Sequence, residues 1–138
     1  MKYTSFIIGC ILLLMACKNH TPQQLLVGNW QFNNILYQQE ISPENKPLIE
    51  ANIASLRQSF SLEYHADNTY HSHSIKDEIG KWKLNEAGTA LTHTDNDGEQ
   101  HYQVVQLTSD SLSLKTTLQA QTLTLQFIRK KWGKHTGY

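Results

Sequence analysis

Residues 79–107 read IGKWKLNEAGTALTHTDNDGEQHYQVVQL, and this stretch decides the fold class. Apolar and polar residues alternate in it, with Trp82 and Leu84 on one side and Lys81 and Lys83 on the other. Such alternation predicts half-buried β-strands, because successive side chains of a strand point to opposite faces. The segments NEAGT and DNDGE are rich in turn-forming residues, so we expect them to join neighbouring strands as hairpins.

The same period-two pattern extends over most of the chain. It predicts eight strands, at Gly28–Tyr37, Ser59–His65, Thr69–Ile75, Ile79–Leu84, Ala90–Thr94, His101–Leu107, Ser111–Leu118 and Thr122–Lys130. Helical spacing occurs once, in KPLIEANIASLRQSF, where apolar residues recur at Ile49, Ile53, Leu56 and Phe60. We expect one helix there, over about Leu48–Arg57.

Nearly all the connections between these strands are short, which makes neighbouring strands antiparallel. A meander of half-apolar strands either stacks on itself or closes into a barrel. A closed barrel of eight strands has no exposed edge, and its interior is filled by side chains or holds one small ligand. The predicted fold is therefore all-β, with one short helix between the first and second strands, placed to plug an open end of the barrel.

The N-terminus has the form of an export signal. Lys2 is followed by an apolar run of roughly ten residues, Phe6–Ala16, which is too short to span a bilayer. The predicted organisation is a signal peptide at 1–16, a tether at 17–25, a β-barrel domain at 26–132 and a C-terminal tail at 133–138.

The end of that run, Leu14-Met15-Ala16-Cys17, resembles the lipobox of bacterial lipoproteins. The resemblance implies cleavage before Cys17 and attachment there of a diacylglyceryl group and an amide-linked acyl chain such as palmitate, which anchors the protein in a membrane. No thiol would then remain, which excludes disulfides and thiolate metal sites. By the same resemblance, Lys18 favours the outer membrane of a Gram-negative bacterium. The alternative is an ordinary secretory signal with a chance cysteine.

Charge excludes one class of partner. Lys plus Arg and Asp plus Glu number 12 each, so no overall field attracts nucleic acid. Basic residues gather only at the end, in RKKWGKHTGY, which either contacts anionic head groups or is a solvated strand end.

Four segments in order carry a family resemblance: LVGNWQF, FSLEYHADNTY, GKWKL and YQVVQLTSDSLSL. The first resembles the Gly-x-Trp signature of lipocalin and calycin barrels, with Gly28 and Trp30 at the marked positions. The series, over residues 25–130, is similar to lipocalin-like lipoproteins of Bacteroidetes. The resemblance implies an eight-stranded up-and-down barrel in which Trp30 packs across the closed end, a structural role that suits a large ring.

The strands also carry aromatic residues suited to a cavity. The candidate ligand-binding residues are Tyr64, Tyr70, Trp82, Tyr102 and Phe127. Facing inward, they would line an apolar cavity with a few hydroxyl groups, as small-ligand sites are usually lined. The alternative is that they simply fill the core.

Histidines are the other candidates. His71 and His73 fall on one strand face in HSHS, near enough to share a metal, with His65, His93 and His101 in or near neighbouring strands. No HExxH box, GxSxG elbow or glycine-rich phosphate loop occurs in the sequence, so we expect no catalytic residues, no resident metal and no cofactor. The alternative to ligation is that the histidines face solvent.

The sequence therefore predicts a non-enzymatic, membrane-anchored protein of the cell envelope that binds a small hydrophobic or amphipathic ligand, such as a lipid or fatty acid. An envelope protein-interaction or inhibitor module is the alternative, acting through DNDGEQH and the helical first connection. A metal-dependent hydrolase that uses His71 and His73 is the third reading.

Overall fold

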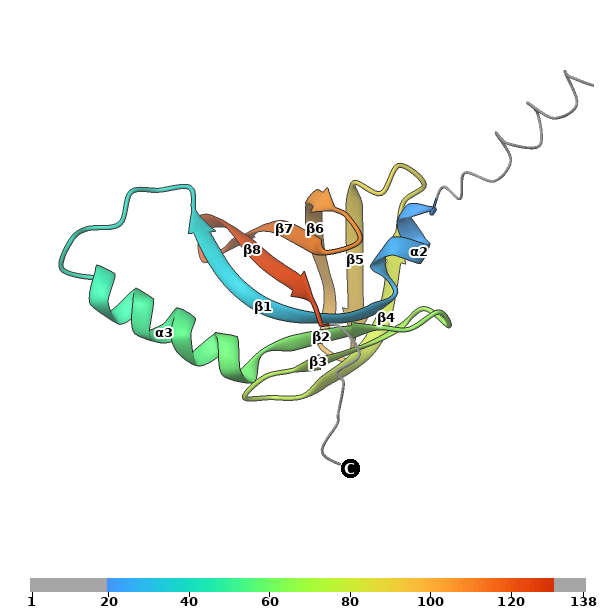
Figure 1. The fold of residues 1–138 in the computed structure, drawn as a ribbon, viewed down its shortest axis with the longest axis horizontal. Coiled ribbons are helices and arrows are strands. Elements are labelled where there is room, and N and C mark those ends of the chain that lie inside the picture. Colours follow the sequence, from blue (N-terminus) through green and yellow to red (C-terminus); the bar gives the residue numbers. More distant parts are fainter. Residues whose placement is uncertain (1–19, 131–138) are drawn as a thin grey trace, which may run out of the picture.

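Eight antiparallel strands close into one barrel. A computed structural model describes residues 20–130, so the predicted signal peptide, Cys17 and the tail at 133–138 lie outside the described residues. Each strand pairs with the next, and the last returns to pair with the first (Figure 1). The strands are β1 (Gly28–Tyr37), β2 (Ser61–Tyr64), β3 (Thr69–His73), β4 (Glu78–Leu84), β5 (Ala90–Asp95), β6 (Gly98–Leu107), β7 (Ser111–Leu118) and β8 (Gln121–Arg129). The predicted up-and-down barrel is confirmed.

Alternation along each strand decides which side chains enter the barrel. In β4, Trp82 and Leu84 are buried whereas Lys81 and Lys83 are exposed, as predicted. Between β2 and β3, Tyr64 lies opposite Tyr70 and both are buried. The strand residues that alternate with these buried ones therefore place their side chains on the outer face of the barrel.

A short helix that the sequence analysis missed precedes the barrel. Helix α2 spans Pro22–Leu26, and the Thr21 side chain and the Gln24 side chain cap each other's backbone N–H groups. Gln23 Nε2 donates to the backbone oxygens of Leu84 and Asn85, which ties the helix to the end of β4. The tether predicted to run to residue 25 is therefore wrong over this helix, which belongs to the fold. Five residues are too few to show helical periodicity, although the capping box was visible.

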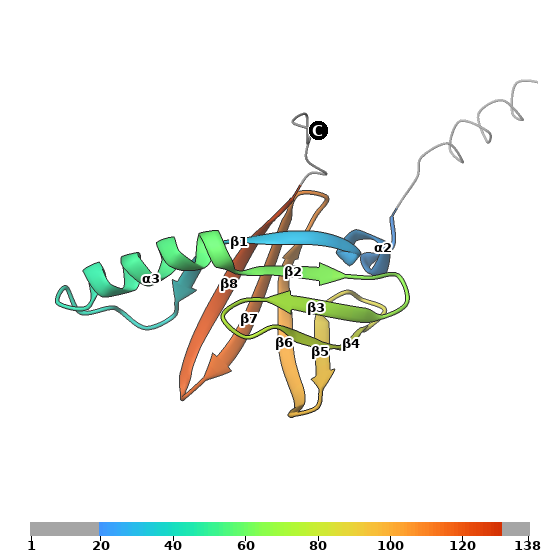
Figure 2. The same ribbon diagram turned by 90° about the horizontal axis from the view of Figure 1, so that it is seen from below.

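The predicted helix exists and is longer than expected. Helix α3 spans Lys46–Ser59, with Pro47 in its first turn. Figures 1 and 2 both show it projecting beyond the barrel beside β1. Only its inner face packs: Ile53 is buried and Leu56 lies against the core, whereas Leu48 is 64% exposed. The helix therefore covers the barrel opening with its last turns and does not plug it along its length.

Some strand ends also differ from the predicted ones. β2 begins at Ser61 and not Ser59, because α3 continues to Ser59 and Phe60 closes it with a backbone hydrogen bond to Leu56. β6 begins at Gly98, three residues early, because the DNDGE hairpin turns over only two residues. Hydrophobic alternation does not extend into these polar ends, so it cannot locate them.

The α2 end of the barrel is closed by Trp30. Its ring is fully buried, and its Nε1 donates to the Leu26 oxygen over 2.8 Å. The Arg129 guanidinium lies 4.2 Å from the ring centroid, and it also donates to the backbone oxygens of Val27, Leu25 and Ser109. Gly28 has φ +140°, and a Cβ there would collide with Arg129 Nη1. Arg129 is thus a structural residue that the sequence analysis placed in a basic tail.

The turn between β7 and β8 offers a stability prediction. Its two central residues, Gln119 and Ala120, have φ of 50° and 66°. A Cβ costs roughly 1–2 kcal/mol in this left-handed region, and glycine does not carry that cost. We expect Ala120→Gly to raise the free energy of unfolding in urea by about 1 kcal/mol. Ala90→Gly, at an exposed strand position, should lower it by about 0.5–1 kcal/mol. Equal losses in the two variants would contradict the turn geometry.

Candidate functional site

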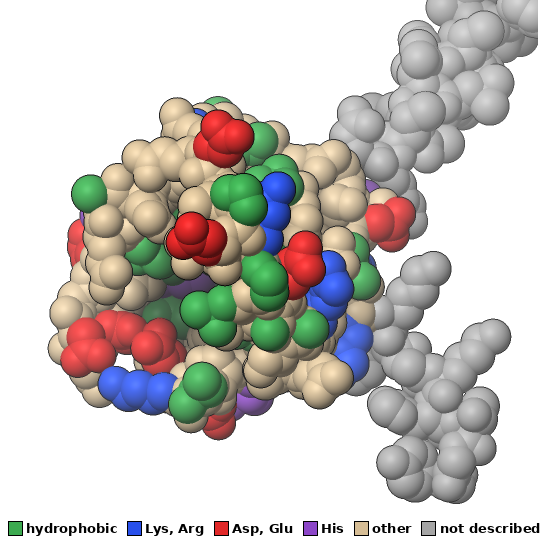
Figure 3. Space-filling view, turned by 90° about the vertical axis from the view of Figure 1, so that its left-hand side faces the viewer, with side chains coloured by type: hydrophobic (Ala, Val, Ile, Leu, Met, Phe, Trp, Pro, Cys, Tyr) green, Lys and Arg blue, Asp and Glu red, His purple; other side chains and the backbone are tan. Residues whose placement is uncertain are grey.

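A cavity of about 280 Å³ opens into the barrel beside the last turns of α3. Figure 3 views this end of the molecule and shows the surface hollowed between hydrophobic and acidic side chains. The apolar lining residues are Leu56, Phe60, Leu62, Leu114 and Leu125. The polar lining residues are Tyr70, Ser72, Ser74, Glu78, His93, Gln100 and Tyr102.

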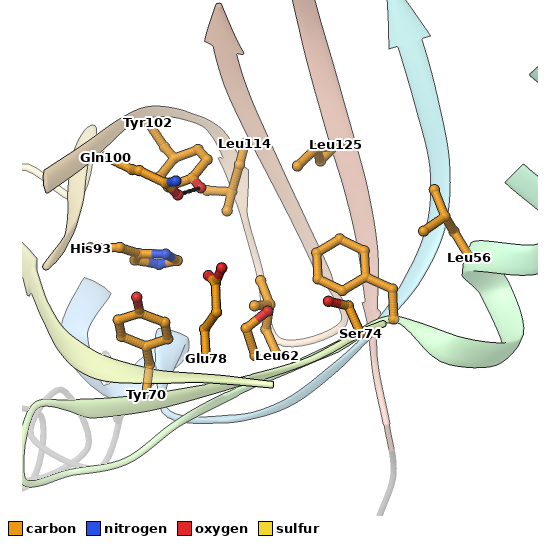
Figure 4. Close-up of a pocket in the computed structure, with 12 residues that line it drawn as sticks. Leu56, Leu62, Tyr70, Ser74, Glu78, His93, Gln100, Tyr102, Leu114 and Leu125 are labelled. Carbon is orange, nitrogen blue, oxygen red and sulfur yellow. Dashed lines mark hydrogen bonds between the residues drawn. The ribbon is translucent and has the colours of Figure 1, made fainter. Parts of the chain in front are cut away.

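Most of the polar lining residues lie on one side of the cavity, and Ser74 lies on the apolar side. In Figure 4, His93, Tyr70, Glu78 and the Gln100–Tyr102 pair face one another on one side, and leucines line the other. The polar side comes from β3 to β6, and the apolar side from α3, β2, β7 and β8. The cavity is therefore amphipathic across its width.

His93 is a buried polar group of the site. It is 5% exposed, and its Nε2 shares a 2.8 Å hydrogen bond with the Tyr64 hydroxyl. Burial lowers the pKa of His93 from 6.5 to about 4, against the opposing effect of the Asp95 carboxylate. The imidazole is therefore neutral at pH 7. The Tyr64 hydroxyl is the hydrogen-bond partner of His93 Nε2 among the described residues. When this hydroxyl donates to Nε2, the imidazole carries its proton on Nδ1.

Two tyrosines flank this imidazole. The Tyr70 ring stacks on it at 4.3 Å between centroids, and the Tyr102 ring lies at 4.8 Å. Burial, followed by the nearby carboxylates of Glu78 and Asp95, raises the pKa of each tyrosine to about 12. Both hydroxyls thus stay protonated. Tyr102 donates to Gln100 Oε1 over 2.7 Å, whereas Tyr70 lines the cavity beside His93.

The five aromatic residues singled out from the sequence have different places. Tyr70 and Tyr102 line the cavity. Tyr64 is buried behind His93. Trp82 is buried beside Tyr64, with the two ring centroids 6.0 Å apart, and its Nε1 donates to the His65 backbone oxygen. Phe127 is buried against Phe60, one residue removed from the cavity. Three of the five are therefore core residues that support the wall.

Sequence reasoning missed most of the polar side. It considered the histidines as metal ligands or, alternatively, as solvent-facing residues, and the solvent-facing alternative is wrong for His93, which is buried. The signal was present, because His93 follows buried Leu91 at the same period-two face. Glu78 and Gln100 lie at strand ends, where no hydrophobic pattern indicates which residues face the opening.

The outer face of the barrel brings together the other sequence candidates. His71 and His73 lie side by side on β3 with ring centroids 3.7 Å apart, and Glu63 of β2 joins them. One ligand atom from each of the three lies within 4.8 Å of the others. Of residues 20–130, these three could hold a metal ion.

The helices of the described part of the chain, residues 20–130, are too short or too polar to cross a bilayer.

Known proteins place this barrel in a family. A family model described as a lipocalin-like domain matches residues 26–114. A solved lipocalin-like protein from Bacteroides uniformis ATCC 8492 is 13% identical, with 77% of this chain and 99% of that chain covered at a TM-score of 0.50. A DUF4847 family protein from Bacteroides vulgatus ATCC 8482 is also 13% identical, with 79% and 96% covered at a TM-score of 0.49. No curated protein matches the chain. Since the family model covers well over half of the sequence, this chain belongs to the family of lipocalin-like domains.

Proposed function

We propose that this protein binds one small amphipathic molecule in the barrel cavity, without catalysis. The lipocalin-like barrel fold itself suggests ligand binding. The observation that carries the proposal further is the division of the cavity into a leucine-lined side and a side of hydrogen-bonding groups. A molecule with an apolar tail and a polar head would satisfy both sides, because buried polar groups need partners.

The charges in the cavity select the head group. Glu78 lines the cavity, and no lysine or arginine of residues 20–130 does. The low pKa of His93 leaves its imidazole neutral at pH 7, so it offers no compensating positive charge. A carboxylate head would face Glu78 without a cation, which is unfavourable. The ligand is therefore a neutral or cationic amphiphile, and a fatty acid is a poor fit.

The proposal includes an envelope location. Cys17, at the end of the lipobox-like segment, would carry the lipid anchor, and only four residues separate it from α2. That short connection supports a barrel held close to the membrane, where amphiphiles are concentrated. The barrel would face the periplasm or the cell exterior.

Mass spectrometry of the full processed chain, extracted from bacterial membranes, tests both parts. We expect a covalent lipid mass at Cys17 that survives denaturation, and a second mass that is present under native conditions and lost on unfolding. An unlipidated chain starting elsewhere would contradict the anchor. A native mass free of any second component, unchanged after incubation with lipid extract, would contradict the ligand and favour interaction through the loops.

Three probes with one tail test the head-group preference: octylamine, octanol and octanoate, titrated calorimetrically at pH 7.5. We expect octanoate to bind at least about tenfold more weakly than the other two, because like charges placed together are costly. Glu78→Gln should reduce this difference in affinity between octanoate and the other two probes. Glu86→Gln, in an exposed turn, should leave the difference unchanged. Octanoate as the tightest ligand would overturn the assignment.

A further inference from the structure

Glu63, His71 and His73 lie together on the outer face of the barrel, away from the cavity. Glu63 is paired directly with His71 across β2 and β3, and His73 follows two residues later on the same face. Ser72, which lies between the two histidines, and its partner Leu62 on β2 point the other way and line the cavity. The three side chains thus belong to a surface that the proposed ligand does not use.

The distances fit a metal ion. His73 Nε2 and Glu63 Oε1 share a hydrogen bond and lie 3.2 Å apart. Two ligand atoms of a tetrahedral zinc site, each about 2.0–2.2 Å from the metal, are about 3.3–3.6 Å apart. All three candidate ligand atoms lie within 4.8 Å of one another, so small rotations about the side-chain bonds would bring them onto one ion.

One nitrogen that could ligate a metal makes no hydrogen bond among the described residues. His71 Nε2 is buried and has no hydrogen-bond partner among the described residues. Its nearest charged neighbour is Asp77 Oδ2 at 3.7 Å, which is too far for a hydrogen bond. Buried polar atoms without a partner are rare in proteins, and an ion is one of the accepted explanations.

We propose that Glu63, His71 and His73 bind a divalent transition-metal ion, Zn²⁺ being the best fit. Two imidazoles and one carboxylate suit zinc, whereas Mg²⁺ and Ca²⁺ prefer oxygen ligands throughout. Three protein ligands leave a fourth position open. The nearest carboxylate to His71 Nε2 is Asp77, whose Oδ2 lies 3.7 Å away; its other oxygen, Oδ1, lies 3.9 Å from His73 Nδ1, the ring nitrogen that does not face Glu63.

The test is equilibrium dialysis of the full chain in detergent against Zn²⁺, using protein purified without a polyhistidine tag and stripped with a chelator. We expect one Zn²⁺ per chain, not displaced by millimolar Mg²⁺. His71→Gln and His73→Gln should each weaken binding at least about 100-fold, because even outer-shell partners of a metal contribute 10–100-fold. Glu63→Gln should weaken it as well.

The matched control is His101→Gln. His101 lies 3.5 Å from Glu99, so it is a histidine–carboxylate pair without a second histidine. It should leave Zn²⁺ binding unchanged. Absorption of bound Co²⁺ gives a second measurement, and it should show tetrahedral bands in the wild type that both β3 variants lose. Substoichiometric Zn²⁺, or equal losses in His101→Gln and His71→Gln, would overturn the site. Thermal unfolding without metal identifies any variant that fails to fold.

Discussion

Trp30→Ala should lower the free energy of unfolding by about 3–5 kcal/mol, the usual range for truncating a fully buried large aromatic side chain. The ring is 0% exposed, and three kinds of contact meet on it. It packs in the core, its Nε1 donates to Leu26, and the Arg129 guanidinium lies over its face. Removing the ring leaves a cavity and takes away a packing partner of Arg129, which ties β8 to the backbone of residues 25–27.

Urea denaturation followed by circular dichroism measures this loss. Leu36→Ala is the matched control, because Leu36 is a large apolar residue on the same strand and is 48% exposed. It should cost well under half as much. Trp30→Phe should fall between the two, since it keeps a ring but loses the hydrogen bond. A Trp30→Ala loss no larger than that of Leu36→Ala would show that Trp30 does not hold the closed end.

Stability should also fall steeply in mild acid because of His93. Burial lowers the pKa of His93 from 6.5 to about 4, so between these values the unfolded chain binds a proton that the folded protein does not. Stability from this group is fully present above pH 6.5 and is lost as the pH falls toward 4. The linkage amounts to about 3 kcal/mol, since each pKa unit corresponds to about 1.4 kcal/mol.

The measurement compares wild type with His93→Gln by urea denaturation at several values from pH 7.5 to pH 4. The glutamine retains an amide group beside the Tyr64 hydroxyl but does not titrate. Subtracting the two curves cancels the carboxylate titrations that both proteins share. We expect the free energy of unfolding of the wild type, relative to that of His93→Gln, to fall by about 3 kcal/mol between pH 7.5 and pH 4, because only the wild type loses this contribution. Parallel curves would mean that His93 takes up its proton in the folded barrel over the same pH range as in the unfolded chain.

Local pattern accounts for much of the fold. The alternation of Trp82 and Leu84 with lysines identified β4, and the spacing of Ile49, Ile53 and Leu56 identified α3. Both are properties of a few neighbouring residues, so they are visible without knowing what packs against them. Helix α2 was missed for the same reason, because one turn has no period to detect.

The sites required more than pattern. His93 and Gln100 lie directly opposite each other in the register of β5 and β6, and Glu63 lies opposite His71 in that of β2 and β3. Arg129 reaches the chain entry only because β8 pairs with β1. The sequence by itself thus determined the strands, the one long helix, the apolar residues that face inward and the closing tryptophan. The tertiary structure decided which polar residues meet in the cavity and on the outer face, because strand register and barrel closure are set by all eight strands together.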